Sequence, residues 1–117
     1  MKNRQQLVNR ALKEIGINPL STESYASVNE LVDGLFDSLN HRDIVYAVTP
    51  TTATASLDEE LFLPIASCLA YRAAPEMGVT DVNQLSYMKA KCDMAELEMK
   101  KIKASAYTRQ IAEGQYF

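Results

Sequence analysis

Apolar residues are densest between Leu61 and Gly78, and this segment predicts a central helix buried on most sides. Its large apolar side chains recur at helical spacing, and its alanines would let neighbouring helices approach closely. Ser56 and Glu59 have capping-box spacing, which predicts the helix start, and the closing glycine can adopt a left-handed end. Pro64 and Pro75 lack a backbone donor, so we expect a kink near each; the helix could instead begin at Pro64.

Two amphipathic helices are predicted before this central segment. Asn3, with a glutamine three residues later, resembles a capping pair, and Gly16 is a stop signal. Ser27 and Glu30 repeat the capping-box spacing and predict that a second helix starts there and ends within residues 40–43. The apolar faces of the two helices are formed by Leu7, Val8, Ala11, Leu12, Ile15, Leu31, Val32, Leu35, Phe36 and Leu39.

Residues 44–54 differ from the helical segments in composition. The β-branched and aromatic residues of 44–48 predict a short extended segment, and residues 49–54 read as a polar loop, so we expect an extended loop or hairpin near 44–54. Such a loop could pair as an edge strand with a neighbouring copy, although Pro50 would limit the pairing to one edge. The candidate inter-subunit residues are Thr49, Thr51, Thr52 and Thr54.

A long final helix is predicted from Asp81 to Arg109, with Thr80 as its cap. Its apolar or small positions alternate in steps of three and four, which is a heptad seam. The helix would be about 44 Å long, so part of it should project. The seam could pack against the central helix or against a helix of another copy, and the sequence leaves both open. The seam positions are Leu85, Met88, Cys92, Ala95, Met99, Ile102 and Ala106.

The last eight positions depart from the heptad pattern and predict an extended tail. We therefore divide the chain into a helical domain, residues 1–109, and a tail, residues 110–117, with Gly114 as a helix breaker. A tail that ends in two aromatic residues is suited to docking onto a partner, because aromatics dominate interface energies; the alternative is a frayed, solvated chain end. The candidate partner-binding residues are Tyr107, Arg109, Gln115, Tyr116 and Phe117.

Composition supports one small, mostly helical domain. The 117 residues are 47% hydrophobic and 23% charged, with a net charge of −3. No apolar run approaches the roughly 18 residues of a membrane span, and no signal peptide is visible, so we expect synthesis in the cytoplasm and no membrane contact. Acidic residues predominate between Glu14 and Glu60, and the mildly acidic chain disfavours nucleic-acid binding.

Candidate catalytic chemistry is sparse. Cys68 and Cys92 are far apart in sequence and His41 is the single histidine, so we expect buried free thiols and no metal, cofactor or disulfide framework. A glycine-rich phosphate loop and a nucleophile elbow are both missing, and His41 is expected at the surface. The acidic run of residues 58–60 reads as favourable charge at a helix N-terminus. These observations predict a protein that is not an enzyme.

Residues 69–78, LAYRAAPEMG, resemble the "LA-x-R-L-A-P-E-aromatic-G" signature of the head-to-tail connector (adaptor) proteins of tailed bacteriophages. The first helix, with its Leu-x4-Leu-x3-Gly pattern from Leu7 to Gly16, is also similar to that family. Arg72 and Glu76 are one turn apart, so we expect them to pair and to serve structure. The residues that carry the resemblance are Leu69, Ala70, Arg72, Pro75, Glu76 and Gly78.

This resemblance implies a structural subunit of the virion neck, at the head-tail junction, made in the host cytoplasm. Such subunits form a dodecameric ring beneath the portal protein, extend the channel through which genomic DNA passes without sequence-specific binding, and contact a further tail or adaptor protein. Two other classes remain open: a small helical adaptor or regulator that dimerises through the heptad seam, and an enzyme without a visible motif, such as a muralytic enzyme.

Overall fold

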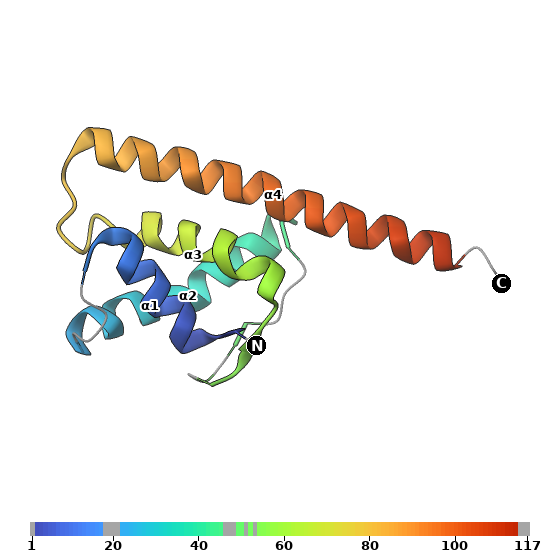
Figure 1. Cartoon of the computed structure of the whole chain (residues 1–117), viewed down its shortest axis with the longest axis horizontal. Helices are drawn as coiled ribbons and strands as arrows, with labels where there is room; N and C mark the ends of the chain where they lie inside the picture. The colour runs from blue at the N-terminus through green and yellow to red at the C-terminus, as the bar shows by residue number, and fades with distance from the viewer. Residues whose placement is uncertain (1, 18–21, 46–48, 51, 53, 115–117) are drawn as a thin grey trace.

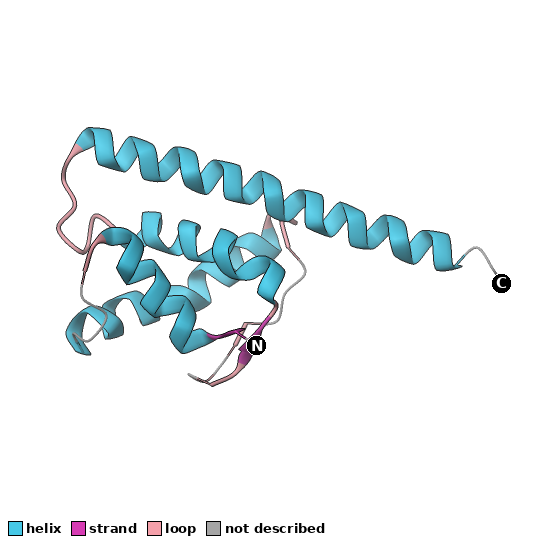
Figure 2. Cartoon of the chain, in the orientation of Figure 1, coloured by secondary structure: helices cyan, strands magenta, loops and turns pink. Residues whose placement is uncertain are grey.

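The computed structural model describes residues 2–17, 22–45, 49–50, 52 and 54–114, with side chains as far as residue 105. The chain is mostly helical, which confirms the predicted all-α class with a long C-terminal helix (Figures 1 and 2). It measures 55 × 32 × 21 Å, and the long dimension follows the last helix (Figure 1). The elements are β1 (Lys2–Asn3), α1 (Arg4–Ile15), α2 (Thr22–His41), β2 (Ser56–Leu57), α3 (Glu59–Ala73) and α4 (Val82–Gly114).

Helix α3 is the centre of the bundle, as its apolar sequence predicts. It contacts α1, α2 and α4, and α4 lies along the side opposite α1 (Figure 1). Ile65, Ala66 and Leu69 are fully buried, so both faces of α3 contribute to the core. The small side chains at Ala66, Ala70 and Ala73 are buried, as expected for close helix packing.

The first helix has the predicted ends. The Asn3 side chain accepts a hydrogen bond from the Gln6 backbone N–H at 2.9 Å, and the Gln6 side chain accepts one from the Asn3 backbone at 3.0 Å. Gly16 has a φ of 93° and donates its N–H to the Leu12 and Lys13 carbonyls, which closes the helix. Local sequence therefore determines both ends of α1.

The predicted starts of α2 and α3 are both wrong. Helix α2 begins at Thr22 and not near Ser27, because half-buried Tyr25 extends its apolar face toward the N-terminus. Helix α3 is capped by Asp58, whose carboxylate accepts from the Glu60 N–H at 3.0 Å, whereas Ser56 lies in β2. The helix also continues through Pro64 instead of beginning there.

Within its described residues the segment near 44–54 forms a loop, one of the two predicted alternatives, and not a hairpin. The short antiparallel pair in this part of the chain joins β1 to β2, with Lys2 opposite Leu57 and Asn3 opposite Ser56 (Figure 2). Asp43 turns the chain after α2 with a φ of 62°, a conformation that aspartate tolerates better than most residues. Ile44 and Val45 are then buried in the core, so their apolar character serves packing and not a strand.

A buried arginine holds the 49–57 region against the first two helices. Arg4 is 7% exposed, and its guanidinium donates to Asn29 Oδ1 at 2.8 Å, to Asp33 Oδ1 at 2.9 Å and to the Pro50 carbonyl at 2.6 Å. A further bond goes to the Asn29 carbonyl at 3.0 Å. A buried charge is tolerated when its donors are satisfied in this way, and here one side chain joins three segments.

Helix α4 differs from its prediction at both ends. Asp81, and not Thr80, provides the cap, because its carboxylate accepts from the Asn83 N–H at 3.0 Å. The helix continues past Arg109 to Gly114, so residues 110–114 of the predicted extended tail are helical, and residues 115–117 lie outside the described residues. The heptad seam packs inside the molecule: Met88, Cys92, Ala95 and Met99 are all buried.

Candidate assembly surface

Helix α4 carries a second apolar seam on the face that points away from the bundle. Tyr87, Met94 and Leu97 are 68%, 71% and 58% exposed, and their spacing of seven and three residues places them on one side of a helix. Ala90, Lys101 and Ala104 continue the same three-four spacing and are also exposed. We call these six positions the outer seam, and the buried face with Met88, Cys92, Ala95 and Met99 the inner seam.

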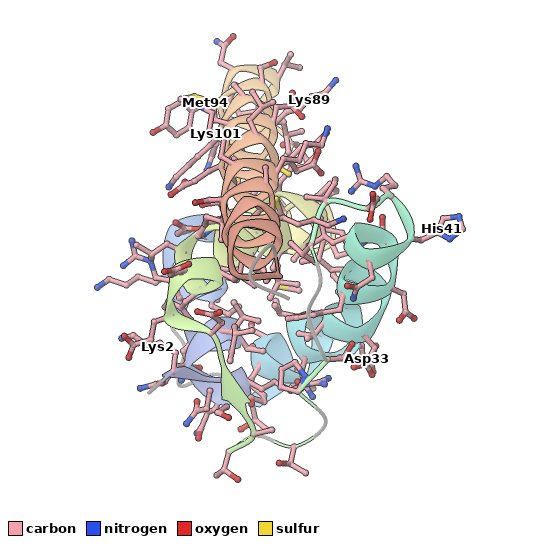
Figure 3. All side chains as sticks on the ribbon, turned by 90° about the vertical axis from the view of Figure 1, so that its right-hand side faces the viewer. Lys2, Asp33, His41, Lys89, Met94 and Lys101 are labelled. Carbon is pink, nitrogen blue, oxygen red and sulfur yellow. The ribbon has the colours of Figure 1, made fainter. Side chains whose placement is uncertain are left out.

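The lysines of α4 fall into two groups, those that form ion pairs with the bundle and those that do not. Lys89, Lys100 and Lys101 are exposed and have no ion pair among the described residues, whereas Lys91 binds Glu14 at 3.0 Å and Lys103 binds Asp43. Figure 3 shows Met94, Lys101 and Lys89 reaching away from the bundle. The outward surface of α4 therefore has a narrow, mostly apolar line that includes Lys101, and its flanks carry both exposed lysines and the exposed carboxylates of Asp93 and Glu98.

Helix α2 presents a contrasting surface. Its sequence contains no lysine or arginine, and its exposed stripe is acidic with two small positions: Glu23, Ala26, Glu30, Asp33, Gly34, Asp37 and His41. Asp33 and His41 lie on the side of the molecule away from Met94 and Lys101 (Figure 3). His41 is exposed, as predicted.

Gly34 is informative because the fold does not require it. A Cβ placed there would meet no atom within 4 Å. Glycine inside a helix is about 1 kcal/mol less favourable than alanine, so the chain tolerates a destabilising residue at an open, exposed position. A close approach by another chain would account for it.

The residues of the 69–78 signature have separate structural roles. Leu69 and Ala70 are buried in the core, whereas Arg72, Pro75 and Glu76 are exposed. The expected Arg72–Glu76 ion pair is not among the ion pairs of the described residues, because Glu76 lies beyond the last helical residue, Ala73.

Gly78 ends this segment as the sequence predicts. It has a φ of 89°, and the preceding turn is closed by the Met77 N–H donating to the Ala73 carbonyl at 3.1 Å. The Val79 N–H donates to the Ala74 carbonyl at 3.0 Å. The signature thus describes how α3 ends and turns toward α4.

The other predicted site residues are only partly described. Thr49 is half-buried, Thr52 and Thr54 are exposed, and Thr51 lies outside the described residues. Tyr107 and Arg109 belong to α4, but their side chains are not described, and Gln115, Tyr116 and Phe117 lie outside the described residues. The docking role of the tail therefore stays a prediction.

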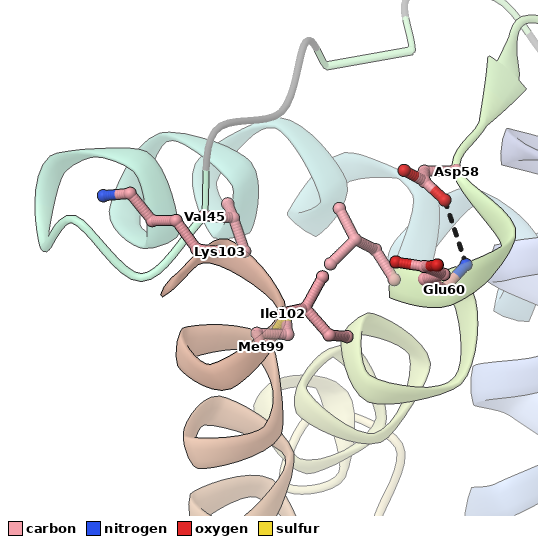
Figure 4. A pocket seen from close by; sticks show the side chains of 7 residues that line it. Val45, Asp58, Glu60, Met99, Ile102 and Lys103 are labelled. Carbon is pink, nitrogen blue, oxygen red and sulfur yellow. Dashed lines mark hydrogen bonds between the residues drawn. The ribbon is translucent and has the colours of Figure 1, made fainter. Parts of the chain in front are cut away.

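A small pocket lies where the start of α3 meets α4 (Figure 4). It has a volume of about 160 Å³ and is lined by the apolar side chains of Val45, Leu61, Met99 and Ile102, with Asp58, Glu60 and Lys103 completing the lining. Ligand pockets usually hold about 300–1,000 Å³. The size and the lining favour a packing gap over a site for a metabolite.

The acidic run Asp58, Glu59 and Glu60 lies at the N-terminus of α3, as predicted from the sequence.

One cluster of possible metal ligands occurs among the described residues. The ligand atoms of Cys68, Cys92 and Glu96 lie within 4.8 Å of one another. Both cysteines are buried free thiols, as predicted. Their sulfurs are 2.9 Å apart, a proximity that their sequence spacing does not indicate. The Glu96 carboxylate accepts a hydrogen bond from Arg42 at 2.9 Å, and this bond raises the pKa of Arg42.

Sequence reasoning missed the outer seam, although its signal was present. The same three-four spacing recurs two residues after each inner-seam position, but alanines and a lysine make the pattern less apolar.

Comparison with protein-family models, curated proteins and solved structures finds no match. Within the described residues, no helix combines the length and the hydropathy needed to cross a membrane.

Proposed function

We propose that this chain is a structural head-to-tail connector subunit of a tailed phage virion, which assembles with copies of itself into a ring beneath the portal protein. The observation that carries the proposal is the outer seam of α4. The inner seam already supplies the contact that the fold needs, so the outer one is available to another chain. The similarity of residues 69–78 to the connector signature supports the class of assembly.

The charges favour a head-to-tail contact between copies. Three lysines of α4, at positions 89, 100 and 101, have no ion pair among the described residues, against the exposed carboxylates of Asp93 and Glu98, whereas the exposed stripe of α2 is acidic. A contact between different faces of neighbouring copies generates a ring when the rotation closes. In this arrangement the outer seam of one copy lies on the α2 stripe of the next, and Gly34 lets the helices approach closely.

The far end of α4 suits the contact with the portal. In Figure 1 the helix extends beyond the other three helices toward the C-terminus. The proposed docking residues Gln115, Tyr116 and Phe117 follow directly, with Tyr107 and Arg109 on the last turns of the helix. Genomic DNA would pass through the ring without sequence-specific contacts, and a further tail or adaptor protein would bind the opposite rim.

A small helical adaptor that dimerises is the second candidate, because two outer seams could also pack against each other. That contact would bring like-charged lysines together at Lys101 and its neighbours, which is unfavourable. The acidic α2 stripe has no such conflict with α4. The charge distribution therefore favours the ring over the symmetric dimer.

The decisive experiment compares Leu97→Glu with Leu63→Glu. Leu97 is on the outer seam and 58% exposed, whereas Leu63 is on α3 and 53% exposed, so both substitutions add one charge at a similarly exposed leucine. Each variant and the unmodified chain would be mixed with portal rings encoded in the same genome and examined by sedimentation velocity and electron microscopy. We expect Leu97→Glu alone to lose ring formation.

Circular dichroism should show equal folding of the two variants. Normal rings from Leu97→Glu, or failure of the unmodified chain to join portal rings at all, would contradict the proposal. A stable dimer that Leu97→Glu dissociates, without any portal binding, would favour the adaptor instead. A chain that ends at Gly114 tests the tail separately: it should keep its melting temperature and lose attachment to the portal.

A further inference from the structure

Two buried sulfurs face each other across the contact between α3 and α4. Cys68 is 2% exposed and Cys92 is 8% exposed, and their Sγ atoms are 2.9 Å apart. A disulfide places its sulfurs about 2.05 Å apart. The remaining distance is about 0.9 Å, and the two helices already hold the sulfurs in contact. This geometry is independent of the function proposed above.

The surroundings distinguish the two thiols. Hydrogen bonding to the Cys68 thiol lowers the pKa of Cys92, and the nearby Arg42 guanidinium acts in the same direction, against burial and the Glu96 carboxylate. The same hydrogen bond, together with burial, raises the pKa of Cys68. The thiolate is the reactive form of cysteine, and Cys92 is also the more exposed sulfur. Cys92 is therefore the attacking group and Cys68 the resolving group.

We propose that Cys68 and Cys92 form a modification site at which hydrogen peroxide joins α3 to α4 through a reversible disulfide. The Cys92 thiolate attacks one peroxide oxygen, the O–O bond breaks, and hydroxide leaves, which gives a sulfenic acid on Cys92. The Cys68 sulfur then attacks the Cys92 sulfur, and the hydroxyl group leaves as water with the Cys68 proton. The leaving hydroxide takes up the proton that Cys92 had lost. Two thiols and one peroxide thus give one disulfide and two waters.

The local chemistry favours this disulfide over a metal centre. Structural zinc is held by four protein ligands, whereas this cluster offers three among the described residues. Glu96 is engaged by the Arg42 guanidinium, so its use as a ligand would break an ion pair of 2.9 Å. The disulfide requires no such change.

The consequence of oxidation is a covalent link in the middle of the inner seam. The link closes a loop over residues 68–92, which contains the end of α3, the turn at Gly78 and the start of α4. A cross-link of this length restricts the unfolded chain and stabilises the folded one. We expect the oxidised protein to melt about 5–10 °C higher than the reduced protein.

The test uses the unmodified chain, freed of reductant and treated with hydrogen peroxide. After denaturation, a maleimide should label both cysteines of the reduced sample and neither cysteine of the oxidised sample, and dithiothreitol should restore both. Electrophoresis without reductant should show a monomer. The oxidation rate should rise with pH through the lowered pKa of Cys92 and level off above it.

The controls are Cys68→Ala and Cys92→Ala, whose melting temperatures should not rise with peroxide. Because the unmodified chain is compared with itself before and after reduction, the test remains valid if either variant folds poorly. Retention of both labels after peroxide treatment would overturn the proposal, and so would a disulfide between chains. Stoichiometric zinc that protects both thiols would also overturn it, in favour of a metal centre.

Discussion

The two seams of α4 have the same spacing but different surroundings. On the inner seam, Met99 is fully buried against the bundle, whereas on the outer seam Met94 is 71% exposed. The difference shows that heptad spacing identifies a face able to pack, while the tertiary contacts decide which face packs inside the monomer. Small residues allow α4 to approach α3 closely on the inner side. The outer side keeps a tyrosine, a methionine and a leucine in solvent, where the proposed neighbouring copy would cover them.

The largest expected effect comes from truncating one methionine on each seam. Met99→Ala should destabilise the monomer by about 2–5 kcal/mol, because it leaves a cavity in the core. Met94→Ala should change the monomer by less than about 0.5 kcal/mol. Urea unfolding of the two variants measures both values. Equal losses of stability would show that the comparison between the seams is wrong.

A second variant tests whether the buried charged side chain of Arg4 can be replaced by an apolar one. Arg4→Met keeps much of the volume but removes the hydrogen bonds to Asn29, Asp33 and the Pro50 carbonyl. We expect a loss of about 2 kcal/mol, because the Pro50 carbonyl and its neighbours lose their donor. The measurement is again urea unfolding, and Arg42→Met provides the exposed control. A neutral or stabilising effect of Arg4→Met would mean that apolar packing alone suffices there.

A third variant, on the exposed stripe of α2, is expected to raise the stability of the monomer, whereas the first two variants lower it. Gly34→Ala should stabilise the monomer by about 0.5–1 kcal/mol, because alanine favours helix and its Cβ meets no atom within 4 Å. The same methyl group should weaken ring assembly if a neighbouring helix packs there. Thermal melting and sedimentation velocity measure the two effects. Improved stability with unchanged assembly would exclude Gly34 from the contact.

The smallest effect is expected for the ion pair that joins the end of α2 to α4. Arg42 Nη2 lies 2.9 Å from Glu96 Oε1, but the arginine side chain is 46% exposed. Arg42→Met should therefore cost less than about 1 kcal/mol, and high salt should reduce the difference. Unfolding at low and high ionic strength checks this. A larger, salt-independent loss would indicate that Arg42 contributes mainly by packing.

Sequence alone predicted the features that depend on local chemistry. The ends of α1 follow from Asn3, Gln6 and Gly16, whose hydrogen bonds form within a few residues. The inner seam and the central position of α3 follow from apolar spacing. These features need no knowledge of distant contacts.

The features that were missed depend on segments far apart in the chain. Ser56 had the spacing of a cap, but its pairing with Asn3 placed it in a strand and left the cap to Asp58. The approach of Cys68 to Cys92 depends on how α3 and α4 pack, and the buried role of Arg4 depends on Pro50, 46 residues later. The hydrophobic periodicity of a sequence does not show which distant segments contact each other.

Lys103 anchors α4 to the segment that follows α2. Its ammonium group donates to the Asp43 carbonyl at 3.1 Å and binds the Asp43 carboxylate, two residues after the end of α2. Beyond Lys103 the helix continues to Gly114, which is about 17 Å at roughly 1.5 Å per residue. A tilt of about 10° of this part of α4 about Lys103 would move the far end of the helix by about 3 Å over that length. A force applied to the C-terminal end would thus act on the end of α2 through the contact between Lys103 and Asp43.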